Sequence, residues 1–414
     1  MKSHLIFLGL ILSLVSLNAQ SGQFVLLDES KMQAVKASLA DKTASKATVD
    51  GYKRLIKEAD KLLDVPNYTV VDKTIIPPGA TKNDFVSINS KYWPDPSKPD
   101  GLPWVREADS NPDTKSDKVD QNRIREMGKA VYTLSQAYYF TDDQRYATKA
   151  ATMLGIWFLA NKSRMTPHLE FAQTKPGDNE RSSSGVLDGS PIAVHVLDSI
   201  NLIRGSDAWL DRYDQVMDQW LGQYLKWLTK SKMANKAAVK DDRHGSWYYY
   251  QTTAVAWYLN DTKVLSKQLK GAKANLARQF DSKGGLPNEL KRTKAFVDSC
   301  TNLEALTATA VIADKAGKKF WNLPSKKKSS IAKGVNFLIP AALNGSWQYD
   351  DPKNVTPYSC LDSFNRYAQF SGSEEAKSAV SNILSNIAAK EKKSGNEKRA
   401  YYRFALHDPA LVSQ

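Results

Sequence analysis

One segment of the chain combines a histidine, an arginine and a run of tyrosines. His244 follows Arg243, and after three further residues the tyrosines begin with Tyr248 and Tyr249. An imidazole with an unperturbed pKa of about 6.5 can take up or donate a proton near neutral pH, and a tyrosine beside a cation can do the same. We therefore expect His244 to be a catalytic group, with Tyr248 or Tyr249 as a second one. The alternative for His244 is a histidine at a helix start that only binds water.

A second segment supplies an arginine and an acid. The guanidinium of Arg292 is a planar fork that can bind a carboxylate with two hydrogen bonds. It could instead form a salt bridge with Glu289, three residues earlier on the same helix face. Asp298 could act as a base if burial raised its pKa, or it could cap the local backbone.

The remaining histidines and the cysteines do not suggest a metal site. His195 lies in an apolar helical pattern, and the five histidines are scattered. We predict no structural zinc and no cofactor. Cys300 and Cys360 could form one disulfide in an oxidising compartment or remain two buried thiols, and the sequence leaves both possibilities open.

These candidate residues must be positioned by helices. Apolar residues recur every three or four positions over 124–139, 144–158 and 206–228. Thr141 and Gln144 fit a capping box in front of the second of these stretches. Such helices, joined by short turns, pack as antiparallel pairs, which indicates a large all-α protein. Three loops, 92–104, 174–189 and 283–287, interrupt the helices and are the places where binding residues are expected.

The N-terminus predicts export, and the charge predicts a polyanionic partner. A lysine precedes an apolar run that ends in small residues, so we read residues 1–19 as a cleaved signal peptide and expect a periplasmic or secreted protein. No later segment is apolar enough to suggest a membrane protein. The net charge of +14 favours an acidic polysaccharide. Nucleic acid is not expected, because the lysines are dispersed.

Several motifs resemble the alginate lyase family. They lie in the expected order at 84–87, 92–96, 99–103, 164–173, 243–248 and 287–294. The resemblance implies an α/α toroid, an incomplete barrel of antiparallel helix pairs, formed by residues 20–414 as a single domain. It also implies β-elimination on a polyuronate such as alginate or glucuronan. The implied substrate-binding residues are Arg243, Arg292, Gln173, Trp93, Trp247 and Asp188.

The chain also departs from the family pattern. Asp242 and Arg243 stand where two asparagines usually precede the histidine, and Asp298 stands where a catalytic tyrosine is usual. The sequence therefore keeps two alternatives open. One is a glycoside hydrolase of the same fold that uses Asp188 and Asp298 as paired carboxylates. The other is a glycan-binding protein that has lost the chemistry.

Overall fold

The computed structural model describes residues 23–412, apart from 179–180, 325, 327 and 351. The expected signal peptide at 1–19 lies outside the described residues. The longer helices are α1 (Glu29–Ala40), α2 (Lys46–Leu63), α3 (Gln121–Thr141), α4 (Gln144–Leu154), α6 (Asp211–Lys230), α8 (Arg243–Tyr258), α9 (Thr262–Gln279), α11 (Ala295–Lys315), α12 (Ile331–Asn344), α13 (Leu361–Ser371), α14 (Glu374–Ala389) and α15 (Gly395–His407). Shorter ones are α5 (Leu197–Ile203), α7 (Lys232–Ala238) and α10 (Pro287–Leu290).

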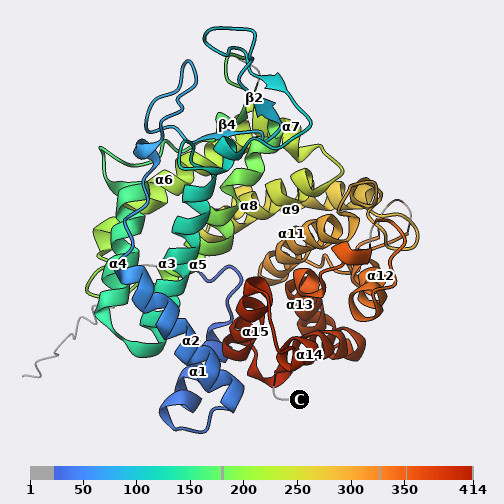
Figure 1. The fold of residues 1–414 in the computed structure, drawn as a ribbon. Helices are drawn as coiled ribbons and strands as arrows, with labels where there is room; N and C mark the ends of the chain where they lie inside the picture. The colour runs from blue at the N-terminus through green and yellow to red at the C-terminus, as the bar shows by residue number, and fades with distance from the viewer. Residues whose placement is uncertain (1–22, 179–180, 325, 327, 351, 413–414) are drawn as a thin grey trace, which may run out of the picture.

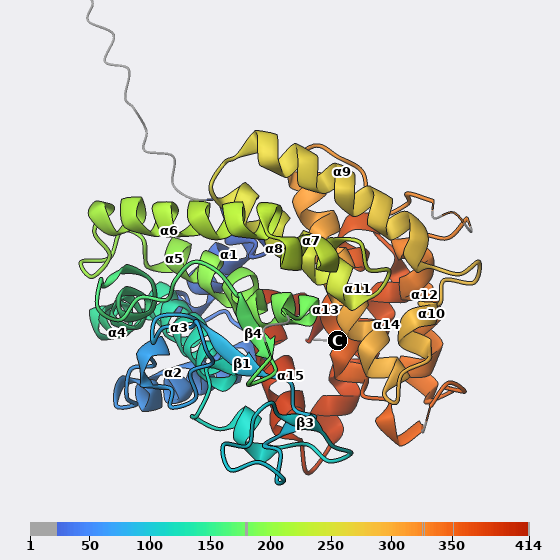
Figure 2. The ribbon, with the colours of Figure 1, turned by 90° about the horizontal axis from the view of Figure 1, so that it is seen from above.

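The helices form a ring with an inner and an outer layer (Figures 1 and 2). The inner helices α3, α8, α11, α13 and α15 each contact the outer helix before and the outer helix after them. For α15 the second outer neighbour is α2, so the end of the chain packs against its beginning. Helix α5 and the π-helix η5 (Ile192–Val196) complete the inner layer between α3 and α8. This arrangement confirms the α/α toroid.

One continuous helical stretch of the inner layer, Ser183–Ile203, is long and apolar enough to cross a membrane. Within the molecule, however, 72% of its most apolar window is buried. Its apolar residues belong to the main hydrophobic core, which extends through the described helices. The hydropathy of this stretch is therefore explained by its place inside the ring.

The helix caps differ in one place from the sequence prediction. The predicted capping box at Thr141 is wrong, because α3 continues to Thr141 and the N-cap of α4 is Asp143, which accepts from Arg145 N. The Thr141 hydroxyl bonds back to its own helix instead. A true capping box begins α15, where Ser394 and Glu397 bond reciprocally. The length of α3 therefore decides between the two candidate N-caps, Thr141 and Asp143.

Short strands fix the loops above the ring. Strand β1 (Val86–Ile88) pairs in parallel with β4 (Phe171–Thr174), and β2 (Tyr92–Trp93) pairs antiparallel with β3 (Val105–Arg106). A fully buried ion pair lies under β1: Lys73 Nζ is 3.0 Å from Asp120 Oδ2, which also accepts a hydrogen bond from Val86 N. Paired in this way, the buried charges anchor the loop that leads into β1.

The first described residues form a strap that is tied into the inner layer. The carboxylate of Asp198 on α5 accepts hydrogen bonds from the backbone N–H groups of Val25, Leu26 and Leu27. Lys315 Nζ at the end of α11 donates to the carbonyls of residues 24 and 25. The strap thus joins two helices that are far apart in the sequence.

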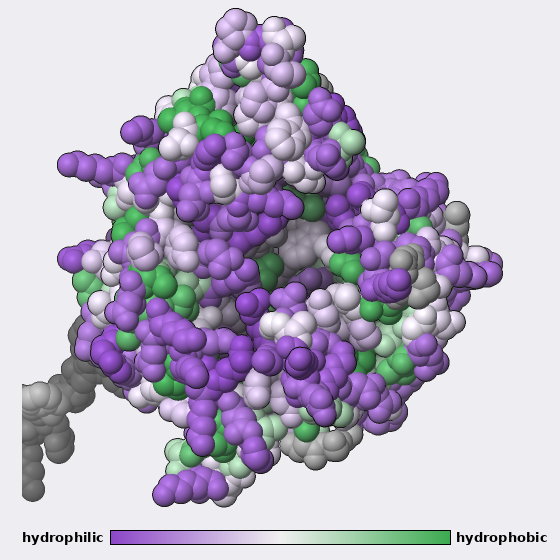
Figure 3. Space-filling view, viewed as in Figure 1, coloured by the Kyte–Doolittle hydropathy of each residue, from purple (hydrophilic) through white to green (hydrophobic). Residues whose placement is uncertain are grey.

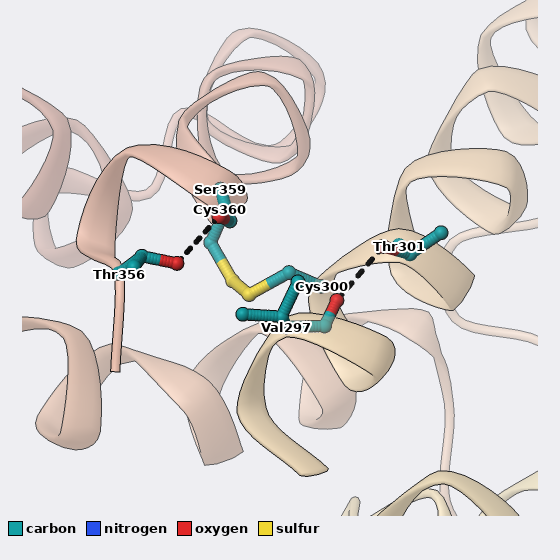
Figure 4. The surroundings of a disulfide bond; sticks show 6 residues. All are labelled: Val297, Cys300, Thr301, Thr356, Ser359 and Cys360. Carbon is teal, nitrogen blue, oxygen red and sulfur yellow. Dashed lines mark hydrogen bonds between the residues drawn. A yellow bond between two sulfur atoms is a disulfide. The ribbon is translucent and has the colours of Figure 1, made fainter. Parts of the chain in front are cut away.

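The two cysteines form a disulfide, which decides between the two possibilities that the sequence left open. Cys300 on α11 is bonded to Cys360 at the end of η7 (Pro357–Cys360), the turn that leads into α13 (Figure 4). Both cysteines are fully buried. The bond therefore ties two neighbouring inner helices together near their N-terminal ends.

Candidate active site

The N-terminus of α8 holds a histidine in a fixed orientation. Asp242 is the N-cap of the helix, and its Oδ1 accepts from His244 N at 2.9 Å and lies 3.0 Å from His244 Nδ1. Burial alone would raise the pKa of Asp242, but the hydrogen bonds from His244 and the charges of His244 and Arg292 lower it to about 2. An ionised Asp242 holds a proton on Nδ1, which leaves Nε2 as the ring atom that can accept a proton.

Arg243, which lies between Asp242 and His244, connects α8 to α11. Arg243 Nη1 donates to Asp298 Oδ1, and Arg243 N donates to Glu289 Oε1 at 2.7 Å. Burial, together with the charge of Arg292, lowers the pKa of Arg243. Asp298 is thus paired with a cation, which favours its carboxylate form. In the described chain, its partner is Arg243 rather than His244.

Glu289 on α10 lies at the centre of the site. Its Oε1 also accepts from Asn302 Nδ2 at 3.1 Å, and its Oε2 is 2.8 Å from Arg292 Nε, although these two atoms are not aligned for a hydrogen bond. Burial raises the pKa of Glu289, against the opposing effect of Arg243 and Arg292. The salt bridge between Arg292 and Glu289, which the sequence offered as an alternative, is therefore present.

Arg292 nevertheless keeps an exposed face. Its Nη2 is 3.5 Å from Asp242 Oδ2, and 31% of its side chain is exposed. We call Asp242, Arg243, His244, Glu289, Arg292 and Asp298 the histidine cluster.

Figure 3 shows that the face seen in Figure 1 is hollowed near its centre, with hydrophilic residues around the rim.

A second set of polar residues surrounds Asp188. This aspartate is 4% exposed, and its two oxygens accept from Gln121 Nε2, Gln173 Nε2 and the hydroxyl of Ser87. The hydroxyl in turn accepts from Gln173 N at 2.7 Å. Gln173 has a φ of 52°, which a non-glycine residue adopts only when its surroundings require it. Asp188 is therefore committed to positioning Gln173, and neither Asp188 nor Asp298 is a free carboxylate.

Among the described residues, the aromatic candidates form no hydrogen bond with the histidine cluster. Trp247 is buried and donates its indole N–H to Thr301 O at 3.0 Å, so it packs between α8 and α11. Tyr248 is buried, and burial raises its pKa. The ring of Tyr249 fills the space beside Gly271 on α9, and burial raises its pKa as well. Trp93 is half-buried on β2, and its indole N–H donates to Asp109 O.

Two members of the histidine cluster were not among the sequence candidates. Asp242 was noted only as a departure from the family pattern, and Glu289 only as a salt-bridge partner. The signal for Asp242 was its position two residues before a histidine at the start of a helix, since an N-cap carboxylate can reach the residue at N2. Glu289 follows Pro287, a residue typical of a first helical turn.

Comparison with known proteins identifies the family of the chain. The family model described as alginate lyase matches residues 69–348. The crystal structure of an alginate lyase from Bacteroides ovatus is similar with a TM-score of 0.81 and 29% identity, covering 93% of this chain and 99% of that chain. Alginate lyase A1-III from Sphingomonas species A1 has a TM-score of 0.55 and 15% identity, covering 83% of this chain and 88% of that chain.

Other comparisons add detail. A histidine-to-alanine variant of A1-III in complex with a tetrasaccharide has a TM-score of 0.54 and 14% identity, and it covers 83% of this chain and 88% of that chain. No curated protein sequence matches the chain. The family model spans more than half of the chain and contains the histidine cluster, and the fold agrees over almost the full length. The chain therefore belongs to the alginate lyase family of polysaccharide lyases.

Proposed function

We propose that the histidine cluster is the active site at which this lyase cleaves a uronate-containing polysaccharide by β-elimination. The observation that carries the proposal is the hydrogen bond between Asp242 and His244 Nδ1. It fixes the imidazole and leaves Nε2 as a base. No described residue forms a hydrogen bond with Nε2, so this atom is available to a substrate.

Arg292 is the residue proposed to bind the substrate carboxylate. Removing the proton on C5 of a uronate places negative charge on C5 and on the adjacent carboxylate. A preorganised cation near that carboxylate stabilises the charge as it forms. The partly exposed guanidinium of Arg292, held by Glu289 and Asp242, meets this requirement. Gln173 and Trp93 would contact neighbouring sugars, Gln173 through its side-chain oxygen and Trp93 through its ring face.

His244 is proposed to act first as base and then as acid. Asp298, at the position where the family usually has a tyrosine, is paired with Arg243 and has no proton to give. His244 Nε2 takes the C5 proton, the C5–H electrons form the C4=C5 double bond, and the C4–O4 bond breaks. The proton on Nε2 then passes to O4 of the leaving sugar. One residue can serve both steps when H5 and O4 lie on the same side of the ring.

The kind of substrate is supported by charge and by the relatives. The chain carries a net charge of +14, which attracts a polyanion over long distances. The Bacteroides ovatus structure is that of an alginate lyase, and A1-III variants have been crystallised with a tetrasaccharide. We therefore place alginate and glucuronan first among the candidate polymers.

The test follows the absorbance of the unsaturated uronate that a lyase produces. Residues 20–414 are incubated with alginate, glucuronan, pectate and sulfated glycosaminoglycans. We expect a rise with at least one polymer, lost in His244→Ala and strongly reduced in Asp242→Asn, which keeps the shape but not the charge that holds the histidine tautomer. The exposed Arg212 on α6 provides a control, Arg212→Gln, that should leave the rate unchanged. An unchanged rate in His244→Ala would remove His244 from the mechanism.

We further propose that the protein is exported. The apolar N-terminal segment and the disulfide between Cys300 and Cys360 both support an oxidising compartment. Fractionation of the source cells should recover a shortened chain outside the cytoplasm. Recovery of the full-length chain inside it would contradict the proposal.

A further inference from the structure

A further group of charged and polar side chains, distinct from the residues around Asp188, lines the inside of the ring. It comes from α3, η5, α11, α13 and α15, and it is separate from the histidine cluster. We call it the lumen cluster, and its members are Tyr132, His195, Glu304, Asp362, Arg366 and Arg403. All six are half-buried.

These side chains face an enclosed space that solvent can still reach. Arg403 forms two hydrogen bonds with Asp362, Nη1 to Oδ1 at 2.5 Å and Nη2 to Oδ2 at 2.7 Å. The two side chains remain 32% and 29% exposed. Desolvation is nevertheless the largest influence on the pKa values of both groups, and also on those of Glu304 and Tyr132. Because these side chains project from inner helices and remain accessible, they face the solvent-filled interior of the ring.

Several groups that face this interior lack partners among the described residues. Arg366 uses only Nη1, which donates to Glu304 O at 3.2 Å and to Thr307 Oγ1 at 3.4 Å. Its Nε and Nη2, the carboxylate of Glu304 and the hydroxyl of Tyr132 form no hydrogen bond within the described chain. His195 Nδ1 is buried without a partner. The free atoms of Arg366, Glu304 and Tyr132 are open to solvent, so they are available to a ligand, whereas a buried unpaired nitrogen such as that of His195 is rare in proteins.

These groups interact with one another. The charges of Arg403, Asp362 and Arg366 all act on the hydroxyl of Tyr132. Those of Arg366 and Arg403 act on Glu304. The hydrogen bonds agree with this: Asp362, which is paired with Arg403, lies one helical turn before Arg366 on α13, and Arg366 reaches Glu304 O on α11, so cationic and anionic groups lie side by side.

We propose that the lumen cluster is a binding subsite for one uronate residue of the glycan cleaved at the histidine cluster. The uronate carboxylate pairs with the free side of Arg366, and its hydroxyl groups bond to the carboxylate of Glu304 and the hydroxyl of Tyr132. This assignment rests on the proposed function. A sugar acid satisfies both kinds of group, because it brings an anion together with hydroxyl donors. Sulfate offers no such donors and would be repelled by Glu304 and Asp362.

The position of the subsite says how the glycan would lie. Glu304 follows Asp298 by six residues on α11, which corresponds to about 9 Å along the helix axis. A chain bound in both places therefore runs into the ring, with its cleaved bond near the start of α8. The length of product on that side is set by the distance between the two clusters.

Binding can be measured without cleavage. In the His244→Ala background, calorimetric titration would use saturated trimers of mannuronate, guluronate and glucuronate as probes. We expect one trimer to bind, and Arg366→Gln to weaken that binding at least about tenfold because a charge-assisted hydrogen bond is lost. Tyr132→Phe removes only a hydroxyl and should weaken binding by a smaller factor. Arg212→Gln is the control with no expected effect.

The outcomes separate the subsite from the proposed function. Melting temperatures close to that of the parent show that a variant is folded, and Tyr132→Phe remains informative if Arg366→Gln is not. Trimer binding that is unaffected by both variants overturns the subsite even where polymers are cleaved. Sulfate that binds as well as the best trimer overturns it too. Trimer binding lost in both variants upholds the subsite, even if no polymer in the panel is cleaved and the proposed function fails.

Discussion

The histidine cluster and the lumen cluster use similar residues in opposite ways. In the histidine cluster, each carboxylate is paired with a cation or accepts a hydrogen bond from a backbone N–H group. Asp298, for example, is paired with Arg243. In the lumen cluster only one such pair forms, between Arg403 and Asp362, while Arg366 and Glu304 keep free atoms. The first cluster lies at or near the starts of α8 and α11, whereas the second, apart from Asp362 in the first turn of α13, lies further along its helices.

The difference separates preorganisation from recognition. Charges that already satisfy one another hold a reacting group such as His244 in place before a substrate arrives. Polar groups that have no partner in the protein and face solvent can exchange their water for the polar groups of a ligand. We therefore expect substitutions in the histidine cluster to change rates, and substitutions in the lumen cluster to change binding.

The largest effect should come from His244→Ala. Loss of a positioned base typically lowers a rate by about 10²–10⁴-fold. Trimer binding should change much less, because the lumen cluster is intact. Steady-state kinetics and calorimetry on the same preparation check both expectations. A variant that loses binding and rate together would erase the distinction between the clusters.

Loss of the disulfide should lower the free energy of unfolding, and it should also affect the lumen cluster. Cys300 and Cys360 are 60 residues apart, and closing a loop of that size stabilises the folded state by about 4 kcal/mol in the chain-entropy account. The bond joins α11, which carries Glu304, to the turn before α13, which carries Arg366. Urea unfolding of the Cys300→Ser, Cys360→Ser double variant measures the loss. Equal stability with and without the bond would contradict this expectation.

Asp242→Asn should alter how the free energy of unfolding depends on pH. The pKa of Asp242 falls from 3.8 to about 2 in the folded protein, so its contribution is complete above about pH 4 and disappears as the pH falls towards 2. That contribution is about 2 kcal/mol. Between pH 7 and pH 4 the variant should be less stable than the parent by a constant amount, and the two curves should converge at lower pH. Unfolding at several pH values tests this, and parallel curves would show that Asp242 is not the cause.

The smallest effect is expected from Arg292→Lys. This substitution keeps the charge but loses the fork that binds a carboxylate at two points. We expect kcat to fall by about tenfold while KM changes less, because the lost hydrogen bond stabilises the charge that forms in the transition state. A rise in KM with unchanged kcat would mean that Arg292 binds the substrate and the transition state equally well and does not stabilise the forming charge.

Much of the fold could be predicted, because it depends on repeated local patterns. The apolar spacing over 124–139 and 206–228 corresponds to α3 and α6. The ring itself required the family resemblance, since periodicity does not say which helices lie inside. The cap of α4 was misplaced by two residues, because Thr141 and Asp143 are both good N-caps and only the length of α3 decides between them.

The site was harder to predict, because it depends on which side of a helix a residue faces. Four of the candidates predicted from the sequence do lie close together in space, namely His244, Arg243, Arg292 and Asp298. Tyr249, however, faces α9, and Trp247 is packed between helices. The lumen cluster could not be found from sequence, since its members lie on separate helices and meet only when the ring closes.

The strap that ties residues 24–27 to Asp198 and Lys315 has a consequence for how the chain folds. Its contacts span 171–173 and 290–291 positions, and α15 at the other end packs against α2. Contacts between distant parts of a chain cost loop entropy before they contribute stability, and they slow folding. A nascent chain that lacks α15 has an open ring with α2 and the strap uncovered. The final closure must therefore wait for almost the whole polypeptide, and trimming at either end should impair the yield of native protein rather than remove one local element.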